Sequence, residues 1–213
     1  MEELSKLIED QKIIAVVRAS DHGDADAVAK ALASGGIKII EITPNVAQYS
    51  KLIELLSKEK DILVGFGSAT DGEQAYRAIN SGARFVSTLY LDKNILTVCK
   101  NNGVLVLQGA STVSEAIEAY NFGVDLIKIF PAHFLGQAPY LKCLKRSFPF
   151  LKLAPSGGVT LENFMDYLKV GVSACVIGRG LIDTGVIRAH QWNEITERAK
   201  QFVQRVESLK VPR

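Results

Sequence analysis

A lysine inside an apolar run is the residue of this sequence best suited to covalent chemistry. Lys128 lies in the run Leu126–Phe130, whose other members are all apolar. Because an unpaired ammonium in apolar packing is costly, we expect this side chain to point into a partly polar interior, where desolvation lowers its pKa. A neutral buried amine is the nucleophile that Schiff-base catalysis requires. A structural lysine paired with Asp125 or another acid is the alternative.

A carboxylate occupies the same kind of setting earlier in the chain. Glu41 lies in the apolar run Ile39–Ile42, where an unpaired charge would again be costly. If it pairs with Lys128, it can move protons while an imine forms and breaks. The alternative is a buried structural salt bridge between the same two side chains.

Two glycine-containing turns in the last third of the chain suit an anion. Glycine lets backbone N–H groups approach a ligand closely, and N–H groups at helix N-termini bind phosphate. Turns also need glycine for purely conformational reasons, so glycine alone does not indicate a binding site. The prediction rests on the position of both turns, which follow the last two predicted strands, where (β/α)8 barrels often bind phosphate. The predicted phosphate-binding residues are Ser156, Gly157, Gly158, Gly178 and Arg179.

The elements that position these residues repeat at a regular spacing. Eight short apolar runs begin near residues 13, 37, 62, 84, 104, 125, 151 and 174, which are 20 to 26 residues apart. Runs that are apolar at nearly every position are typical of parallel strands buried on both faces. Eight successive β–α units predict an α/β fold, a (β/α)8 barrel with its active site at the carboxyl ends of the strands. An open doubly wound sheet is the rival, but no glycine-rich fingerprint follows the first run.

The segments between the strands carry helix signals. Residues 1–12 predict an extra amphipathic helix that plugs the bottom of the barrel through Leu4, Leu7 and Ile8. Capping boxes are predicted at 70–73 and 112–115, and Thr160 is predicted to cap the helix that runs to Leu168. Residues 193–209 predict a final amphipathic helix. No linker divides the chain, so residues 1–213 are predicted to form one domain.

Composition excludes several classes of partner. The 213 residues carry a net charge of +2, which gives no reason to expect nucleic acid or an anionic membrane. No apolar run approaches 18 residues, and the acidic start lacks a signal-peptide core. Cys99, Cys143 and Cys175 are widely spaced among apolar residues, which indicates buried, reduced thiols in a cytoplasmic protein. They and the three histidines are too scattered to predict a metal site.

Five motifs in this order and spacing carry a resemblance to a known family. They are Glu41–Thr43, Gly65–Ser68, Gly109–Glu115, Lys128–Ala132 and Pro155–Val159. Together they resemble the 2-keto-3-deoxy-6-phosphogluconate (KDPG)/4-hydroxy-2-oxoglutarate (KHG) aldolase family. The resemblance covers nearly the whole chain and implies a class I, metal-independent aldolase on a (β/α)8 barrel, commonly a homotrimer, with no cofactor. It implies that Lys128 forms an imine with the keto carbon of a small-molecule substrate and that Glu41 moves protons. Cleavage of the C3–C4 bond then leaves a pyruvate enamine and releases an aldehyde, such as glyceraldehyde 3-phosphate or glyoxylate.

The sequence departs from this family where the pyruvate carboxylate is expected to bind. Asn45 stands where many members have arginine, and asparagine cannot form the bidentate ionic pair. Arg18, after the first strand, can supply the missing cation, and Ser68 keeps the hydroxyl of the usual threonine. We therefore expect Arg18, Asn45 and Ser68 to bind the carboxylate.

Further departures leave the substrate open. Thr88 and Gln108 stand where proline is common, and His133 stands where many members have glutamate. The combination of Arg18 with Asn45 is similar to the 2-keto-3-deoxy-6-phosphogalactonate branch of the family. A phosphate-binding barrel enzyme without imine chemistry, such as a sugar-phosphate epimerase or thiamin-phosphate-type synthase, remains an alternative. So does a non-catalytic binding module.

Overall fold

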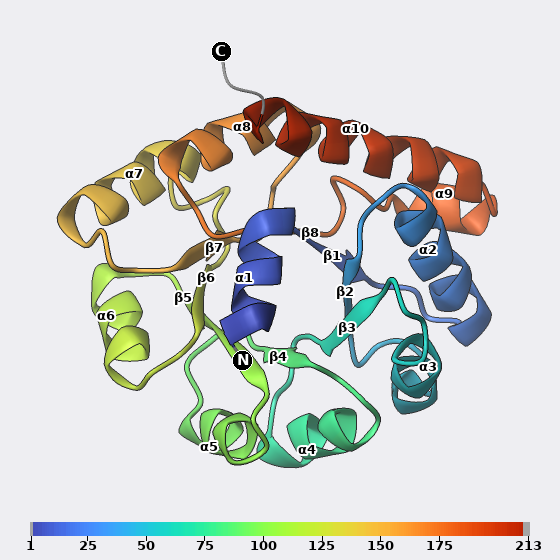
Figure 1. Ribbon diagram of the computed structural model, residues 1–213, viewed down its shortest axis with the longest axis horizontal. Helices are drawn as coiled ribbons and strands as arrows, with labels where there is room; N and C mark the ends of the chain where they lie inside the picture. Colours follow the sequence, from blue (N-terminus) through green and yellow to red (C-terminus); the bar gives the residue numbers. More distant parts are fainter. Residues whose placement is uncertain (1, 211–213) are drawn as a thin grey trace.

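A computed structural model describes residues 2–210 and forms a ring of eight parallel strands inside a ring of helices (Figure 1). From β1 to β7 each strand pairs with the next in sequence, and β8 pairs with β1. A single bridge between Ser156, just after β7, and Val176 on β8 closes the ring. The predicted (β/α)8 barrel is confirmed, and every strand begins within two residues of its predicted position. The strands are β1 (Ile13–Val17), β2 (Ile39–Ile42), β3 (Leu63–Phe66), β4 (Phe85–Ser87), β5 (Leu105–Ala110), β6 (Leu126–Ile129), β7 (Leu153–Pro155) and β8 (Cys175–Ile177).

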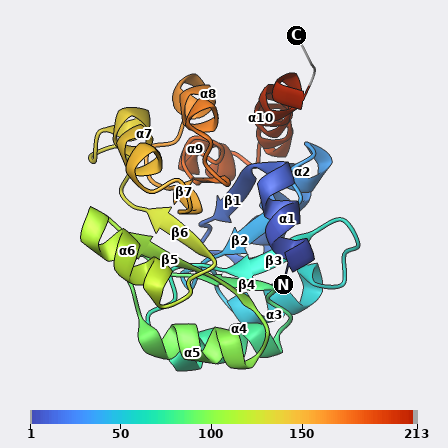
Figure 2. The same cartoon turned by 60° about the vertical axis from the view of Figure 1, so that its left-hand side comes forward.

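The helices cover the outside of the barrel (Figure 2). The short helix α9 lies between β8 and the long last helix α10, and the sequence patterns do not predict it. On α10 the side chains of Ile195, Ala199, Phe202 and Val206 are buried, which confirms the predicted apolar face. The helices are α1 (Glu2–Gln11), α2 (His22–Ser34), α3 (Tyr49–Leu56), α4 (Gly72–Asn80), α5 (Lys93–Asn101), α6 (Val113–Asn121), α7 (Gln137–Ser147), α8 (Leu161–Val170), α9 (Thr184–Arg188) and α10 (Trp192–Lys210).

Two of the three predicted helix caps are confirmed. Thr112 and Glu115 form the expected capping box, and Thr160 is the N-cap of α8. The box predicted at 70–73 is wrong by one residue, because the carboxylate of Asp71 accepts the backbone N–H of Gln74 at 2.8 Å. A carboxylate interacts more favourably than a hydroxyl with the positive end of the helix dipole, so it takes the capping position.

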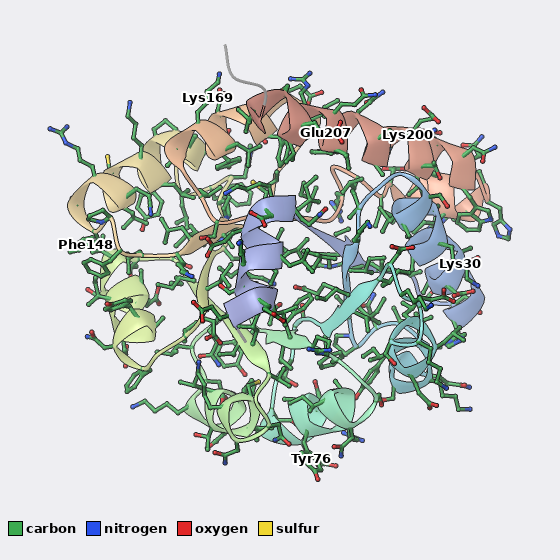
Figure 3. The ribbon with its side chains drawn as sticks, viewed as in Figure 1. Lys30, Tyr76, Phe148, Lys169, Lys200 and Glu207 are labelled. Atoms are coloured by element: carbon green, nitrogen blue, oxygen red, sulfur yellow. The ribbon has the colours of Figure 1, made fainter. Side chains whose placement is uncertain are left out.

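Helix α1 closes one end of the barrel, as predicted, through Leu4 and Ile8 but not through Leu7. Figure 1 shows it lying across the ring of strands. Ile8 is fully buried and belongs to the apolar cluster inside the barrel, where Leu4 packs against it. Charged side chains such as Lys30, Lys169 and Lys200 instead project outward from the peripheral helices (Figure 3). The opposite end of the barrel, where the strands end, is therefore the open one.

The inside of the barrel forms an apolar cluster distinct from the layer between strands and helices. Because side chains on a strand alternate between the two sides, the cluster identifies which positions face inward. Beyond Ile39 on β2, Phe85 on β4 and Leu126 on β6, the next inward positions are polar. The inward cluster comprises Ile8, Ile14, Val16, Ile39, Phe85, Leu105, Leu107, Leu126, Ala154, Ala174 and Val176.

The expectation for the cysteines is wrong at one position. Cys99 and Cys175 are buried, and burial raises the pKa of the Cys99 thiol to about 12. Cys143 is exposed, because it lies on the face of α7 opposite the buried Leu141 and Leu144. Among residues 2–210 no helix is both long and apolar enough to cross a bilayer.

Candidate active site

Three polar side chains meet inside the barrel, one from each of three alternate strands. Lys128 Nζ on β6 lies 3.3 Å from Glu41 Oε1 and 3.2 Å from Oε2 on β2. Lys128 also donates a hydrogen bond to Ser87 Oγ on β4, and the Ser87 hydroxyl donates to Glu41 Oε2 at 2.8 Å. All three residues are at most 1% exposed. The predicted pairing of Lys128 with Glu41 is therefore present, as part of a three-membered network.

The alternative prediction, that Lys128 pairs with Asp125, is wrong. Asp125 lies on the other side of the sheet, where its carboxylate accepts hydrogen bonds from Lys100 Nζ at 2.9 Å and from the backbone N–H of Val106 at 2.8 Å. It is fully engaged outside the barrel. Among residues 2–210, Glu41 is therefore the only acidic residue whose carboxylate lies beside the Lys128 amine.

Glu41 and Lys128 lie within β2 and β6, one residue before the end of each strand. Glu41 pairs in register with Val16 and Gly65, and Lys128 pairs with Gly109 and Ala154. The strand pairing continues for one residue beyond Glu41 and Lys128. These next residues, Ile42 at the end of β2 and Ile129 at the end of β6, face outward. Hydrogen-bonded strands on both sides therefore hold each charged side chain, which gives more precise positioning than a loop would.

Glycine at position 67 makes room for the carboxylate. A Cβ there would lie 1.9 Å from Glu41 Oε1, so Glu41 rests directly against the backbone that follows β3. Any side chain at this position would push the carboxylate away from Lys128. The Gly65–Ser68 motif therefore serves the geometry of Glu41.

Burial sets the protonation behaviour of the amine. Desolvation lowers the pKa of Lys128 below its ordinary value, the nearby Glu41 carboxylate opposes this shift, and the positive charge of Arg18 adds to it. The net direction is downward, as expected from the sequence. A larger fraction of the amine is therefore unprotonated, and nucleophilic, than for a surface lysine.

A cavity of about 500 Å³ opens at the carboxyl ends of the strands. All five predicted phosphate-binding residues line it, so the structure brings them together. Its charged or titratable lining residues are Arg18, His133 and Arg179, with no Asp or Glu among them. Such a cavity favours an anionic ligand. The complete lining is Val16, Arg18, Phe130, Pro131, His133, Phe134, Ser156, Gly157, Gly158, Val159, Thr160, Gly178, Arg179 and Gly180.

The two turns owe their shape to glycine. Gly157 and Gly158 have φ angles of +83° and +78°, in the left-handed region. A Cβ at Gly158 would lie 2.3 Å from that of His133, and a Cβ at Gly180 would lie 2.1 Å from the Val159 carbonyl oxygen. The turns thus pack against each other and against the loop after β6.

The turns are not helix N-termini, contrary to the sequence-based expectation. Helix α8 begins at Leu161, and α9 begins at Thr184 with Asp183 as its cap. The turns can still bind an anion through their own backbone. Within residues 2–210, the N–H group of Gly158 has no acceptor in the backbone.

The Lys128 amine lies just below the floor of this cavity. Lys128 and Glu41 are not among the lining residues, but their neighbours are. Val16 pairs in register with Glu41, Phe130 follows Lys128 by two residues just past the end of β6, and Ser156 follows its register partner Ala154 by two. The amine therefore lies beneath residues that line the cavity.

The residues predicted to bind a carboxylate are only partly brought together. Arg18 and Asn45 line a second pocket of about 270 Å³, and Arg18 also lines the main cavity. Asn45 Oδ1 accepts a hydrogen bond from the Thr43 hydroxyl at 2.6 Å. Ser68 lines neither pocket, and its backbone has a φ of +57°.

Thr88 and Gln108, at the two positions where proline was expected to be common, both bond to the loop between β4 and α5. The Gln108 side chain points outward and makes two hydrogen bonds with the backbone of Asp92, at 3.2 Å and 2.8 Å. The Thr88 hydroxyl donates to the carbonyl of Tyr90. Together they fix the loop from β4 to α5, whose Leu89 carbonyl lies over Gly109. These substitutions therefore act on a loop at the barrel mouth and do not contact the amine.

Sequence reasoning missed Ser87 and left His133 outside the site. Ser87 belongs to the network around Lys128, and His133 lines the anion cavity. The signal for Ser87 was present, because counting alternate positions from Phe85 places Ser87 on the inward face of β4.

A buried lysine paired with a carboxylate, below an anion-binding cavity at the carboxyl end of a (β/α)8 barrel, has the features of a Schiff-base aldolase site. A model of the family KDPG and KHG aldolase matches residues 4–198. The chain therefore belongs to the KDPG and KHG aldolase family, and it is a class I aldolase.

Relatives and solved structures agree with this assignment. A 2-dehydro-3-deoxy-phosphogluconate aldolase of Pseudomonas aeruginosa is 30% identical over 95% of this chain and 92% of its own length. A KDPG aldolase from Legionella pneumophila, with pyruvate captured at low pH as a covalent carbinolamine intermediate, is 29% identical with a TM-score of 0.84, covering 92% of this chain and 96% of its own. A native KDPGal structure is 25% identical with a TM-score of 0.84, covering 93% and 96%.

The contact between Gly67 and Glu41 generates a prediction. Gly67→Ala should displace the Glu41 carboxylate and slow imine formation with pyruvate by about 10²-fold, the effect of a misplacement of about 1 Å. Borohydride trapping at timed intervals measures this rate, and thermal unfolding monitors the fold. The control is Gly72→Ala at the start of α4, where a Cβ would approach no atom closer than 3.3 Å. Wild-type kinetics in Gly67→Ala would contradict the proposed positioning of Glu41.

Proposed function

We propose that this aldolase reversibly cleaves a 2-keto-3-deoxy-6-phospho sugar acid or 4-hydroxy-2-oxoglutarate to pyruvate and an aldehyde, glyceraldehyde 3-phosphate or glyoxylate. The observation that carries the proposal is the desolvated Lys128 amine, hydrogen-bonded to Ser87 and paired with Glu41, directly below a cavity with a cationic lining. A substrate with an anionic group at each end fits this arrangement.

In the proposed mechanism Lys128 Nζ adds to the keto carbon to give a carbinolamine, and this carbinolamine then loses water to form a protonated imine. The imine accepts the electron pair of the breaking C3–C4 bond, which leaves an enamine of pyruvate and frees the aldehyde. Glu41 removes the proton from the C4 hydroxyl and delivers protons to the leaving water. Because the imine is itself the electron acceptor, this route needs neither a metal nor a cofactor.

The two ends of the substrate are assigned to different parts of the mouth. Arg18 is proposed to bind the pyruvate carboxylate, helped by Asn45 in the adjoining pocket and by Ser68. At the other end, Arg179 and the backbone of Gly157 and Gly158 are proposed to hold phosphate, together with Ser156 and Gly178. An arginine combined with backbone N–H groups suits a phosphate dianion.

A second candidate is 2-keto-3-deoxy-6-phosphogalactonate. The observation in its favour is that Arg18 and Asn45 line one pocket, so the cation that binds the carboxylate comes from the end of β1 rather than from position 45. The two phosphorylated candidates differ in configuration at C4, one of the two carbons of the bond that breaks. A panel of both sugar acids and 4-hydroxy-2-oxoglutarate distinguishes the candidates by kcat/KM.

Three further features complete the proposal. We propose that residues 1–213 act as one domain, that the chain assembles as a homotrimer, as the family resemblance implies, and that it works in the cytoplasm. The three free cysteines are compatible with a reducing compartment.

Borohydride trapping tests the imine. Wild-type protein incubated with pyruvate and borohydride should gain one reduced pyruvyl group on Lys128, located by mass spectrometry of peptides. Lys128→Gln should gain none, because it removes the buried amine. The control Lys100→Gln changes a lysine that pairs with Asp125 outside the barrel and should label like wild type. Labelling elsewhere than Lys128, or none in wild type, would contradict the proposed function.

A pair of arginine variants tests the assignment of the substrate ends. Arg18→Ala should raise the KM for pyruvate in the condensation direction by about tenfold, because about 1.4 kcal/mol of binding corresponds to tenfold and a hydrogen bond to a charged group is worth about 1.5–3 kcal/mol. Arg179→Ala should raise the KM for phosphorylated aldehydes but leave that for glyoxylate unchanged. Each variant serves as the control for the other. If Arg18→Ala leaves the pyruvate KM unchanged, the carboxylate is held elsewhere.

A further inference from the structure

We propose that Ser87 is a catalytic residue whose hydroxyl passes protons between Lys128 Nζ and Glu41 Oε2. The inference rests on the proposed imine chemistry and adds a residue that the motifs did not identify. Ser87 contacts the reacting nitrogen itself, since it accepts a hydrogen bond from Lys128. It simultaneously donates one to Glu41 at 2.8 Å.

The distances favour a route through the hydroxyl over direct transfer. Hydrogen bonds between an ammonium and a carboxylate are normally about 2.7–2.9 Å long. Lys128 Nζ lies 3.2 Å and 3.3 Å from the two Glu41 oxygens, so the direct contact is stretched. Both bonds to Ser87 are shorter than either direct contact. A hydroxyl both donates and accepts, so it can take a proton from nitrogen while it gives its own to the carboxylate.

Because the site is buried, solvent water cannot carry protons from the Lys128 amine in place of the Ser87 hydroxyl. Ser87 is 0% exposed, and the Lys128 and Glu41 side chains are 2% and 1% exposed. Protons that leave the amine therefore need a protein group as carrier. The hydroxyl contributes little to the fold by comparison, because the serine Cβ would remain in alanine and the strand pairing of β4 uses only backbone atoms.

The proton balance of imine formation defines what the relay does. Starting from the ammonium–carboxylate pair, one proton moves from Nζ to Ser87 Oγ as the Ser87 proton moves to Glu41 Oε2, which frees the amine lone pair. The amine then bonds to the keto carbon, the C=O π bond opens onto oxygen, and Glu41 protonates that oxygen. A second proton follows the same path from nitrogen and departs with the oxygen as water. One proton stays on the imine nitrogen, and Glu41 is a carboxylate again.

The test compares Ser87→Ala with a matched control. Thr88→Val removes the neighbouring hydroxyl, which faces away from the amine and bonds the Tyr90 carbonyl. The rate of pyruvate imine formation is followed by timed borohydride trapping across pH and in H2O–D2O mixtures. Ser87→Ala should slow imine formation by about 10²-fold, the low end of a general acid–base contribution. Its rate should depend linearly on the deuterium fraction, whereas the wild-type and Thr88→Val rates should curve, because two protons move together.

Two more variants keep the test decisive. Ser87→Thr retains a hydroxyl and should recover curvature and most of the rate, and Ser87→Gly replaces Ser87→Ala if the alanine variant does not fold. Ser87→Ala with the wild-type rate and curvature would overturn the relay while leaving the aldolase intact. Ser87→Ala that is slow but still curved would also overturn it, because the hydroxyl would then only position Glu41. Absence of an adduct in wild type would instead contradict the proposed function.

Discussion

The charge pair between Lys128 and Glu41 is the interaction on which the rest of the structure depends. Moving an ammonium and a carboxylate from water into an apolar barrel carries a desolvation penalty that their attraction only partly offsets, and removing one partner of such a pair costs about 3–5 kcal/mol. The barrel confines the pair to its open end, above a packed apolar interior. Because the pKa of Lys128 is lowered in the folded protein, the unfolded chain binds the proton more tightly. The free energy of unfolding should therefore rise with pH across the interval between the folded pKa and the ordinary value.

Glycine residues around this pair allow close packing that a side chain would prevent. Gly67 allows Glu41 to rest on the backbone, and Gly158 and Gly180 allow the turns after β7 and β8 to close around the anion cavity. In the proposed function, specificity depends on a few side chains at the strand ends. Arg18 and Asn45 line the pocket proposed for the carboxylate, and His133 lines the main cavity.

The fold and the pairing of Lys128 with Glu41 could be predicted because both follow from periodicity and burial. Apolar runs at a regular spacing indicate parallel strands. Opposite charges inside such runs are expected to pair, because an unpaired buried charge is costly. Ser87 was harder to find, because a serine can be buried at little cost when it is bonded and its type alone indicates no function. That Ser68 lines neither of the pockets that contain Arg18 was not predictable, because apolar periodicity does not indicate how the loop after β3 folds. The same is true of Cys143, whose exposure depends on how α7 is rotated against the barrel.

The protonation of Lys128 is the most direct measure of whether the barrel holds a desolvated catalytic amine. Titration of lysine Cε resonances by carbon-13 NMR, with Lys128 assigned through Lys128→Gln, gives the midpoint in the absence of substrate. We expect a midpoint below the ordinary value of about 10.4, and a still lower one in Glu41→Gln, because Glu41 opposes the shift. A midpoint at or above 10.4 in the wild-type protein would contradict a desolvated, nucleophilic Lys128.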